Sequence, residues 1–503
     1  MLVRALEMGV TSYHGHARIL IQLRRRRERT HESVGNASSS VGASLSVEEH
    51  DKTFLVSPNH IFSCGFYKGG KNAFYFSIWF TNTFDKTVIW TANSGVPVNG
   101  HGSKIYFNED GNLVLYDVGG STVWESKMTL GKAATVHLLE SGNLVIKNSS
   151  NAVVWESFDS PTDTLLPLQP LTKNKKLISS YYRLYYDNDN VLRLMYDGPQ
   201  VSSIYWPSPD SKMFDNGRTS YNSSRIAILD KKGRFTSSDG LNIVTSDFGP
   251  TSVWRRLTIT QDGNLKIYSL NVSNGSWIIT WQALILVCKV HGLCGNNGIC
   301  EQSPNPQCYC PPGYEMVNPQ NWTKGCQPMF NNINQAKEQV KFVRLHHTDF
   351  YGFDMGYNAS NISFYDCKKY CSSASSCLGF SYKLNGKGEC YTKSLLFNGH
   401  KGPFFRGSFY IKKRNNSNFS TISAAAAQQS HLICKNISEV VASGEPSHIV
   451  DPKLRGQFDH HQAMEMVGVS LSCMGERSQR PTMDSIVTVL MSCNEDDDQT
   501  IYA

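Results

Sequence analysis

The chain has 503 residues, of which 40% are hydrophobic and 18% are charged, and its formal net charge is +7. This length exceeds what one hydrophobic core usually organises, so several domains in series are expected, and the composition excludes a largely disordered chain. Short apolar runs are broken by glycine, serine and asparagine. This pattern predicts a mainly β, multidomain fold.

The first 45 residues are predicted to be an atypical N-terminal tail. A basic cluster, Arg24–Arg27 with Arg29, carries much of the net charge, and such clusters can bind nucleic acid or anionic lipid. Because no aromatic platform or DNA-reading motif accompanies it, we expect a solvated tail and no nucleic-acid partner. Residues 2–21 lack the apolar core and cleavage site of a signal peptide. No stretch approaches the roughly 18 apolar residues of a membrane helix, so none is predicted.

A short motif recurs in the first third of the chain. Gly111–Val114 (Gly-Asn-Leu-Val) is repeated as Gly142–Val145, and Val123–Ser126 (Val-Trp-Glu-Ser) is repeated at the same spacing as Val154–Ser157. Val88–Thr91 (Val-Ile-Trp-Thr) forms a looser third copy. A repeated unit of short strands that closes on itself buries its tryptophans centrally. The sequence therefore predicts a threefold, β-prism-like domain.

The stretch from Asn108 to Tyr116 alternates polar and apolar residues as a strand does, which would place Asn108, Asp110, Asn112 and Tyr116 on one face. Vicinal sugar hydroxyls need such a row of fixed donors and acceptors. The stretch resembles the mannose motif of bulb-type lectins, Gln-x-Asp-x-Asn-x-Val-x-Tyr. The resemblance implies that Asp110 and Asn112 hydrogen-bond sugar hydroxyls. It also implies that Tyr116 adds its hydroxyl and that Val114 touches the ring carbons.

Two departures from the motif are expected to weaken binding. Asn108 stands where the motif has glutamine and is one methylene shorter. The second copy of the repeat keeps only an asparagine and a valine of the motif. Its residues at the matching positions are Leu139, Ser141, Asn143, Val145 and Lys147. The alternative for either copy is a strand that maintains the fold without binding a ligand.

A second β region precedes the cysteines. Tyr205–Pro209, Arg256–Leu270 and Trp277–Leu284 lead into Cys288 and resemble the S-locus glycoprotein domain. The segment from Asp262 to Tyr268 is similar to the lectin repeat. Lysine replaces its apolar contact residue, so we interpret this copy as structural.

Ten of the 14 cysteines lie between Cys288 and Cys390, which marks small modules that need disulfides to fold. The first six are separated by glycine turns and resemble an EGF-like module. Ser363–Asp366 is a capping-box-like helix start that would place Cys367 and Cys371 one turn apart on a helix, with a strand-like segment after them. This order resembles a PAN/apple module. The two resemblances imply the pairs Cys288 with Cys300, Cys294 with Cys308, Cys310 with Cys326, Cys367 with Cys390, and Cys371 with Cys377, among the many that counting allows.

Two groups of residues could be taken for metal ligands. The one-residue gap between Cys308 and Cys310 is short for a zinc knuckle. His460, His461 and Glu465 are interpreted as a solvated helix face. No metal site is therefore expected.

Sequons for N-glycosylation surround the cysteines and, together with them, predict passage through the secretory pathway. The candidate glycosylation sites are Asn148, Asn222, Asn271, Asn274, Asn321, Asn358 and Asn361.

Four types of domain follow one another in a specific order. The predicted ranges are 46–165 for the bulb-type lectin domain, 166–285 for the S-locus glycoprotein-like domain, 286–326 for the EGF-like module and 327–412 for the PAN/apple module. This order resembles the ectodomain of plant G-type lectin S-receptor-like serine/threonine-protein kinases, which senses a ligand or pairs with another receptor. The resemblance implies a mannose-type glycan or extracellular protein ligand, a receptor partner of the same family, and an extracellular or cell-surface location.

The C-terminal part resembles pieces of a kinase. A polar linker, 413–447, stands where the family has a membrane helix and most of the kinase, and helical periodicity in 448–503 resembles the α-helical end of a kinase C-lobe. Phosphoryl transfer requires a glycine-rich loop, a strand lysine, a catalytic His-Arg-Asp loop and a metal-binding Asp-Phe-Gly. Of these motifs, only Asp-Phe-Gly occurs, at Asp247–Gly249 in the S-locus-like region, and we interpret it as a chance tripeptide. We predict no kinase activity and no cofactor.

Two functions stay open at this point. The first is a receptor-like recognition protein with a carbohydrate- or protein-binding ectodomain and no kinase activity of its own. The second is a fragment of, or mis-spliced product from, a membrane receptor kinase whose full form phosphorylates proteins with ATP. Membrane association would belong only to that full-length form.

Overall fold

The computed structural model describes residues 36–128, 133–302, 305–329, 340–355, 361–402, 405 and 407–414, with 461, 464 and 468. Two compact units divide the chain, residues 33–414 on the one hand and 1–32 with 415–503 on the other. From residue 415 on, the predicted linker lies outside the described residues. The kinase-like segment also lies outside them, except for residues 461, 464 and 468. Asn358, His460 and Glu465 also lie outside them.

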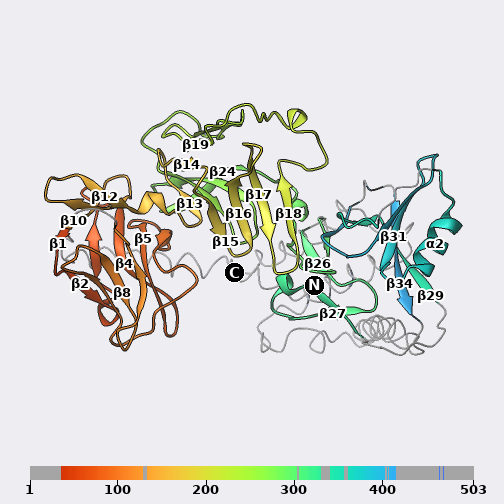
Figure 1. Cartoon of the computed structure of the whole chain (residues 1–503), viewed down its shortest axis with the longest axis horizontal. Coiled ribbons are helices and arrows are strands. Elements are labelled where there is room, and N and C mark those ends of the chain that lie inside the picture. Colours follow the sequence, from red (N-terminus) through yellow and green to blue (C-terminus); the bar gives the residue numbers. More distant parts are fainter. Residues whose placement is uncertain are drawn as a thin grey trace, which may run out of the picture. The chain divides into compact units, whose positions relative to one another are not determined.

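The first domain consists of three four-stranded antiparallel sheets (Figure 1). The first sheet contains β3 (Thr53–Val56), β4 (Phe62–Gly70), β5 (Ala73–Phe80) and β6 (Thr87–Thr91). The second contains β2 (Ser44–Ser46), β7 (Lys104–Phe107), β8 (Leu113–Tyr116) and β9 (Thr122–Glu125). The third contains β1 (Ser38–Ser40), β10 (Ala133–Leu138), β11 (Leu144–Asn148) and β12 (Val153–Glu156).

One tryptophan from each sheet meets the other two at the centre of this domain. The ring centroids of Trp90 and Trp124 are 5.9 Å apart, those of Trp90 and Trp155 are 6.1 Å apart, and those of Trp124 and Trp155 are 5.9 Å apart. All three contacts are edge-to-face, the geometry that aromatic quadrupoles favour. The predicted β-prism with central tryptophans is confirmed.

The boundary predicted between tail and lectin domain is wrong. β1 pairs with β10 and β2 pairs with β7, so residues from Ser38 on belong to the first domain. Leu45, on β2, is only 6% exposed. These strands have three residues each and are rich in serine. They therefore lack the apolar alternation by which a strand is recognised in a sequence.

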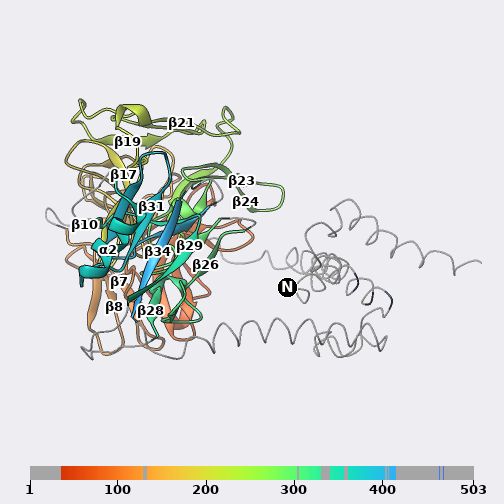
Figure 2. The same cartoon turned by 90° about the vertical axis from the view of Figure 1, so that its right-hand side faces the viewer.

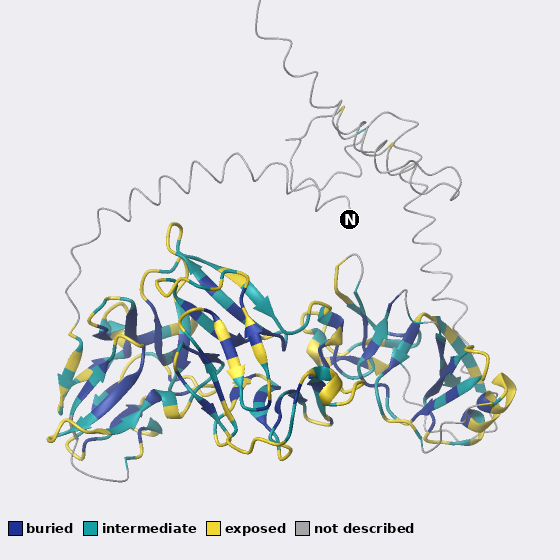
Figure 3. Cartoon of the chain, turned by 90° about the horizontal axis from the view of Figure 1, so that it is seen from above, coloured by how far each residue is buried: buried dark blue, intermediate teal, exposed yellow. Residues whose placement is uncertain are grey.

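The second domain repeats the plan of the first, with three more four-stranded antiparallel sheets. Buried and half-buried residues alternate along one of its strands, Leu192–Asp197. Figure 3 shows buried segments, in dark blue, within the strands of the described chain. One sheet contains β13 (Thr164–Leu165), β22 (Arg255–Ile259), β23 (Leu265–Asn271) and β24 (Ser276–Gln282). Another contains β14 (Leu171–Thr172), β19 (Ile226–Leu229), β20 (Arg234–Ser237) and β21 (Asn242–Val244). The last contains β15 (Leu177–Ser179), β16 (Tyr182–Tyr186), β17 (Leu192–Asp197) and β18 (Ser202–Trp206).

Aromatic side chains join the two β domains. Trp277 of β24 donates from Nε1 to Thr87 Oγ1 over 2.9 Å, and its ring centroid lies 4.9 Å from that of Phe80. Trp254 packs against Phe62 in the same way, at 5.5 Å. Both tryptophans therefore extend the hydrophobic core of the first domain into the second.

The cysteine-rich region is more closely connected than two separate modules would be. β25 (Ile299–Glu301) and β26 (Gln307–Tyr309) form one four-stranded sheet with β30 (Thr348–Phe350) and β33 (Gly399–Lys401). β25 and β33 are parallel, although about a hundred residues separate them in the chain. Ile299 shares a hydrophobic cluster with residues of the second cysteine-rich segment. The two segments thus fold as one body.

The remaining strands complete this region. β29 (Val340–His346), β34 (Gly407–Arg414), β31 (Gly379–Lys383) and β32 (Glu389–Lys393) form a sheet next to helix α2 (Phe364–Ser373), as Figure 2 shows. β27 (Tyr314–Met316) and β28 (Cys326–Pro328) form a separate hairpin. Ser363 begins α2 as predicted, because its Oγ accepts the Asp366 N–H over 3.1 Å. Five disulfides join the cysteine pairs that the resemblances imply: 288–300, 294–308, 310–326, 367–390 and 371–377.

Candidate carbohydrate-binding site

The residues from Asn108 to Asn112 form a tight turn between β7 and β8. The Asn108 N–H donates to the Asn112 carbonyl over 2.9 Å, and the Gly111 N–H donates to the Asn108 carbonyl over 3.0 Å. Gly111 has a φ of 84°, which glycine adopts without strain. The predicted strand across 108–116 is therefore wrong in its first half, because turn chemistry prevails there over alternation.

The two asparagines of this turn have different tasks. Asn108 Oδ1 accepts the Asn112 N–H over 2.8 Å, so this residue stabilises the turn. Asn112 Oδ1 accepts from Ser126 Oγ at 3.1 Å and from the Met128 N–H at 3.0 Å, which ties the turn to the chain after β9. The Nδ2 amide of Asn112 has no hydrogen-bond partner among the described residues. Asp110, at the tip of the turn, is exposed.

The second half of the motif lies on the outer face of the sheet. Val114 pairs with Tyr106 on one side and Glu125 on the other, while Tyr116 pairs with Lys104. Val114 is only 3% exposed, so it can offer a ligand little area. The sequence alone could not identify the neighbours of the motif, because only the hairpin register places them beside it. These neighbours are Tyr106, Lys104 and Glu125.

The copy from Leu139 to Lys147 has the same backbone but a different side-chain network. Leu139 and Asn143 are joined by the same turn hydrogen bond, at 2.9 Å, and Asn143 Oδ1 accepts from Ser157 Oγ at 3.0 Å. Here, however, Asn143 Nδ2 donates to Glu156 Oε2 over 2.7 Å. Its amide is thus occupied from within the protein.

The copy in the second domain is occupied in another way. Asn264 uses both its Oδ1 and its Nδ2 on the backbone of Leu284, at 3.0 Å and 2.7 Å. Lys266 Nζ forms an ion pair with Asp262 Oδ2 at 2.9 Å. These contacts support a structural role for this copy. Of the three copies, only the turn at 108–112 combines an exposed carboxylate with an amide that has no partner in the described structure.

The Asp247–Gly249 tripeptide has a structural environment. Arg255, a fully buried residue, donates from Nη2 to the Asp247 carbonyl at 3.0 Å and to its carboxylate at 2.9 Å. The tripeptide lies between β21 and β22, and its carboxylate serves to satisfy a buried guanidinium.

Most of the described sequons adopt one local geometry. The side-chain Oδ1 of the asparagine accepts the backbone N–H of the residue two positions later, so the amide nitrogen to which a glycan would be attached takes no part in the bond. This turn occurs at Asn148, Asn222, Asn271, Asn274 and Asn321. Asn361 is exposed.

Comparison with known proteins agrees with this architecture. The D-mannose binding lectin family matches residues 87–183, and the S-locus glycoprotein domain matches residues 218–318. The chain is 43% identical to the receptor protein kinase ZmPK1 of Zea mays over 381 residues, which cover 72% of this chain and 46% of the relative. The chain therefore carries a bulb-type lectin domain and an S-locus glycoprotein domain, and its relatives are G-type lectin S-receptor-like kinases.

Relatives that are named G-type lectin receptor-like kinases are less similar to the chain. SD3-1 of Arabidopsis thaliana, a G-type lectin S-receptor-like serine/threonine-protein kinase, is 30% identical over 431 residues, covering 78% of this chain and 54% of the relative. The chain thus spans about half the length of the curated relatives it matches. Among solved structures, a monomeric mannose-binding lectin from Gastrodia elata matches 24% of this chain and 89% of its own, with 21% identity and a TM-score of 0.16. A score that low adds no support for a shared ligand.

The helices among the described residues are short. None of the helices there has both the length and the apolar character that a bilayer requires.

Proposed function

We propose that the chain is a receptor-type recognition ectodomain that binds a mannose-type glycan at the turn and outer face of β8. Asp110 accepts hydrogen bonds from sugar hydroxyls, Asn112 Nδ2 donates one, and the Tyr116 hydroxyl adds a further contact. Val114 contributes a small apolar contact. Asn108, whose Oδ1 is already used within the turn, acts by holding the Asn112 backbone.

The observation that carries this proposal is the unused amide of Asn112. The equivalent amides of Asn143 and Asn264 are bonded within the protein at 2.7 Å, so the same motif offers no donor there. Asn112 is half-buried and its amide nitrogen is not among the buried side-chain atoms that lack a partner, so water or a ligand can accept its hydrogen bond. Vicinal hydroxyls can receive that donor and give their own protons to the Asp110 carboxylate.

A glycan array probed with the secreted chain tests this proposal. We expect weak selectivity for mannose that is abolished by Asp110→Ala. Glu109→Ala is the matched control, since it removes the neighbouring exposed carboxylate of the same turn. An array without mannose signal for the unsubstituted chain would refute the lectin activity and leave the fold unaffected.

The proposed location is extracellular or at the cell surface. Five disulfides support it, because such bonds persist in oxidising compartments, and so do the Asx turns at the sequons. The EGF-like and PAN/apple assignments of the two cysteine-rich segments belong to the same proposal. We also propose a receptor partner of the same family, an extracellular protein as an alternative ligand, and glycosylation at the sequons. The chain itself is proposed to have no kinase activity.

A second function follows from the names of the relatives, which are receptor kinases. A longer protein of which this sequence is a part would phosphorylate proteins with ATP. Transcript sequencing across codons 413–447 separates the two proposals. A membrane helix and a complete kinase encoded between these codons would favour the longer protein, and a continuous transcript would favour the recognition protein.

A further inference from the structure

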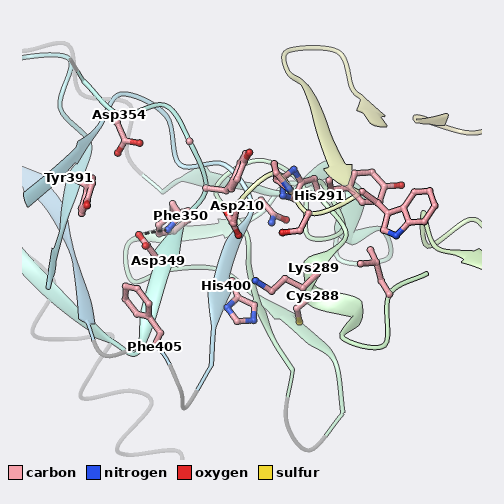
Figure 4. A pocket seen from close by; sticks show the side chains of 18 of the residues that line it. Asp210, Cys288, Lys289, His291, Asp349, Phe350, Asp354, Tyr391, His400 and Phe405 are labelled. Carbon is pink, nitrogen blue, oxygen red and sulfur yellow. Dashed lines mark hydrogen bonds between the residues drawn. The ribbon is translucent and has the colours of Figure 1, made fainter. Parts of the chain in front are cut away.

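A cavity of about 880 Å³ lies where the second β domain meets the cysteine-rich region. No residue of the first domain lines it, so it is separate from the outer face of β8. Figure 4 shows the side chains that surround it. They include Trp206, Asp210, Lys289, Asp349, Tyr351 and His400.

The walls of this cavity are fixed by packing. His291 is 5% exposed, its Nδ1 lies 2.8 Å from Ser203 Oγ, and its ring centroid lies 4.3 Å from that of Tyr351. Phe397 of the cysteine-rich region is fully buried in the core of the second domain. Because buried side chains from both regions hold the walls together, the cavity is preformed rather than created by a ligand.

Opposite charges are balanced around the cavity, which three lysines and three aspartates line. Lys393 is 4% exposed and pairs with Asp354 at 2.8 Å. Asp210 and Lys289 are exposed and have no hydrogen bond or ion pair among the described side chains. Burial raises the pKa of Asp349. A ligand of either net charge would meet a like charge here, which disfavours it.

We propose that this cavity binds a neutral oligosaccharide of a few sugar rings. Each hydroxyl both donates and accepts, so it can use the lysine and histidine donors and the aspartate acceptors that line the cavity together. The apolar faces of the sugar rings pack on Trp206 and Tyr351. The volume lies within the range of about 300–1,000 Å³ that is usual for pockets that bury small ligands.

This proposal does not depend on mannose binding by the first domain. The competing occupant is a short peptide that carries charges of both signs, which would also match the balanced lining. A probe without ionised groups distinguishes the two occupants, because a neutral sugar carries no charge and such a peptide does.

Titration calorimetry of the full chain, secreted with its disulfides formed, tests the proposal. The neutral probes are β-1,4-linked glucotetraose, β-1,4-linked mannotetraose and α-1,4-linked glucotetraose, and the mixed-charge probe is the tripeptide Lys-Gly-Asp. We expect at least one neutral probe to bind. Asp210→Ala and Lys289→Ala should each weaken its binding by about tenfold or more.

Both substitutions remove exposed side chains, so the fold should persist. Asp110→Ala, in the first domain, and Lys232→Ala, at an exposed turn, are the controls and should leave the affinity unchanged. The proposal is overturned if no neutral probe binds or if only the tripeptide binds. It is also overturned if Asp110→Ala abolishes the binding of the neutral probes while the two cavity variants retain it.

Discussion

The two copies of the lectin repeat, 108–116 and 139–147, have one backbone and two different surfaces. Both turns contain a glycine with a φ of 84°. In both, the side-chain oxygen of the asparagine accepts a hydrogen bond from the hydroxyl of the serine that follows the next strand. They differ in the hydrogen bond of the asparagine side-chain amide. Glu156 accepts a hydrogen bond from the amide of Asn143, whereas the amide of Asn112 has no partner among the described residues, Glu125 included. A repeat can therefore keep its fold while its internal hydrogen bonds change. Under the proposed function, that bond and the replacement of two motif residues by Ser141 and Lys147 leave the second copy without a sugar site.

The largest expected effect tests what the two copies share. Trp124→Ala and Trp155→Ala should each lower the free energy of unfolding by about 3–5 kcal/mol, because either removes one third of the central aromatic cluster. Scanning calorimetry of the secreted chain measures both. A large loss for one variant and a negligible loss for the other would show that the copies do not contribute equally to the prism.

The next effect separates the two asparagines. Asn143→Ala should cost about 3 kcal/mol and Asn112→Ala about 2 kcal/mol, since the former loses the additional bond to Glu156. Chemical unfolding followed by tryptophan fluorescence ranks them. The reverse order would contradict the assignment of the additional bond, and Ser141→Ala serves as a control with little change expected.

A smaller change in stability should accompany a gain of function, if the proposed mannose site is correct. The triple variant Ser141→Asp, Lys147→Tyr, Glu156→Ala frees the amide of Asn143 and restores two motif residues, at a cost of about 1 kcal/mol for the lost hydrogen bond. The number of mannose molecules bound per chain should increase by one in titration calorimetry. An unchanged number in a folded variant would show that the amide does not decide ligand capacity.

The smallest effect concerns pH. His137 lies on β10 opposite Val145 of the 139–147 copy, and burial and then the charge of Lys147 lower its pKa. The unfolded chain therefore binds the proton more readily, so this contribution to stability is complete above a pH of about 6.5 and is lost as the pH falls towards the folded pKa. His137→Gln should reduce the fall in the thermal midpoint between pH 7 and pH 5. If the thermal midpoint of His137→Gln falls as much as that of the unsubstituted chain, the contribution of His137 to the pH dependence is refuted.

Much of the architecture could be predicted because it depends on local signals. The recurring Val-Trp-Glu-Ser segments predicted a closed threefold domain, and Ser363 predicted the start of α2. The family resemblance implied the cysteine pairs that the structure contains. The alternation from Asn108 to Tyr116 misled, because a glycine-containing turn outweighs periodicity over so few residues.

The repeated strands with their tryptophans and the start of α2 could be predicted from the sequence, since they follow from side-chain periodicity and a capping residue, and the family resemblance implied the disulfide pairs. Which of these elements contact one another follows from the folded structure alone. The parallel pairing of β25 with β33, the second prism and the partner of each asparagine amide connect residues far apart in the chain. No local pattern encodes such contacts, because they form only when the packing of whole sheets brings their residues together.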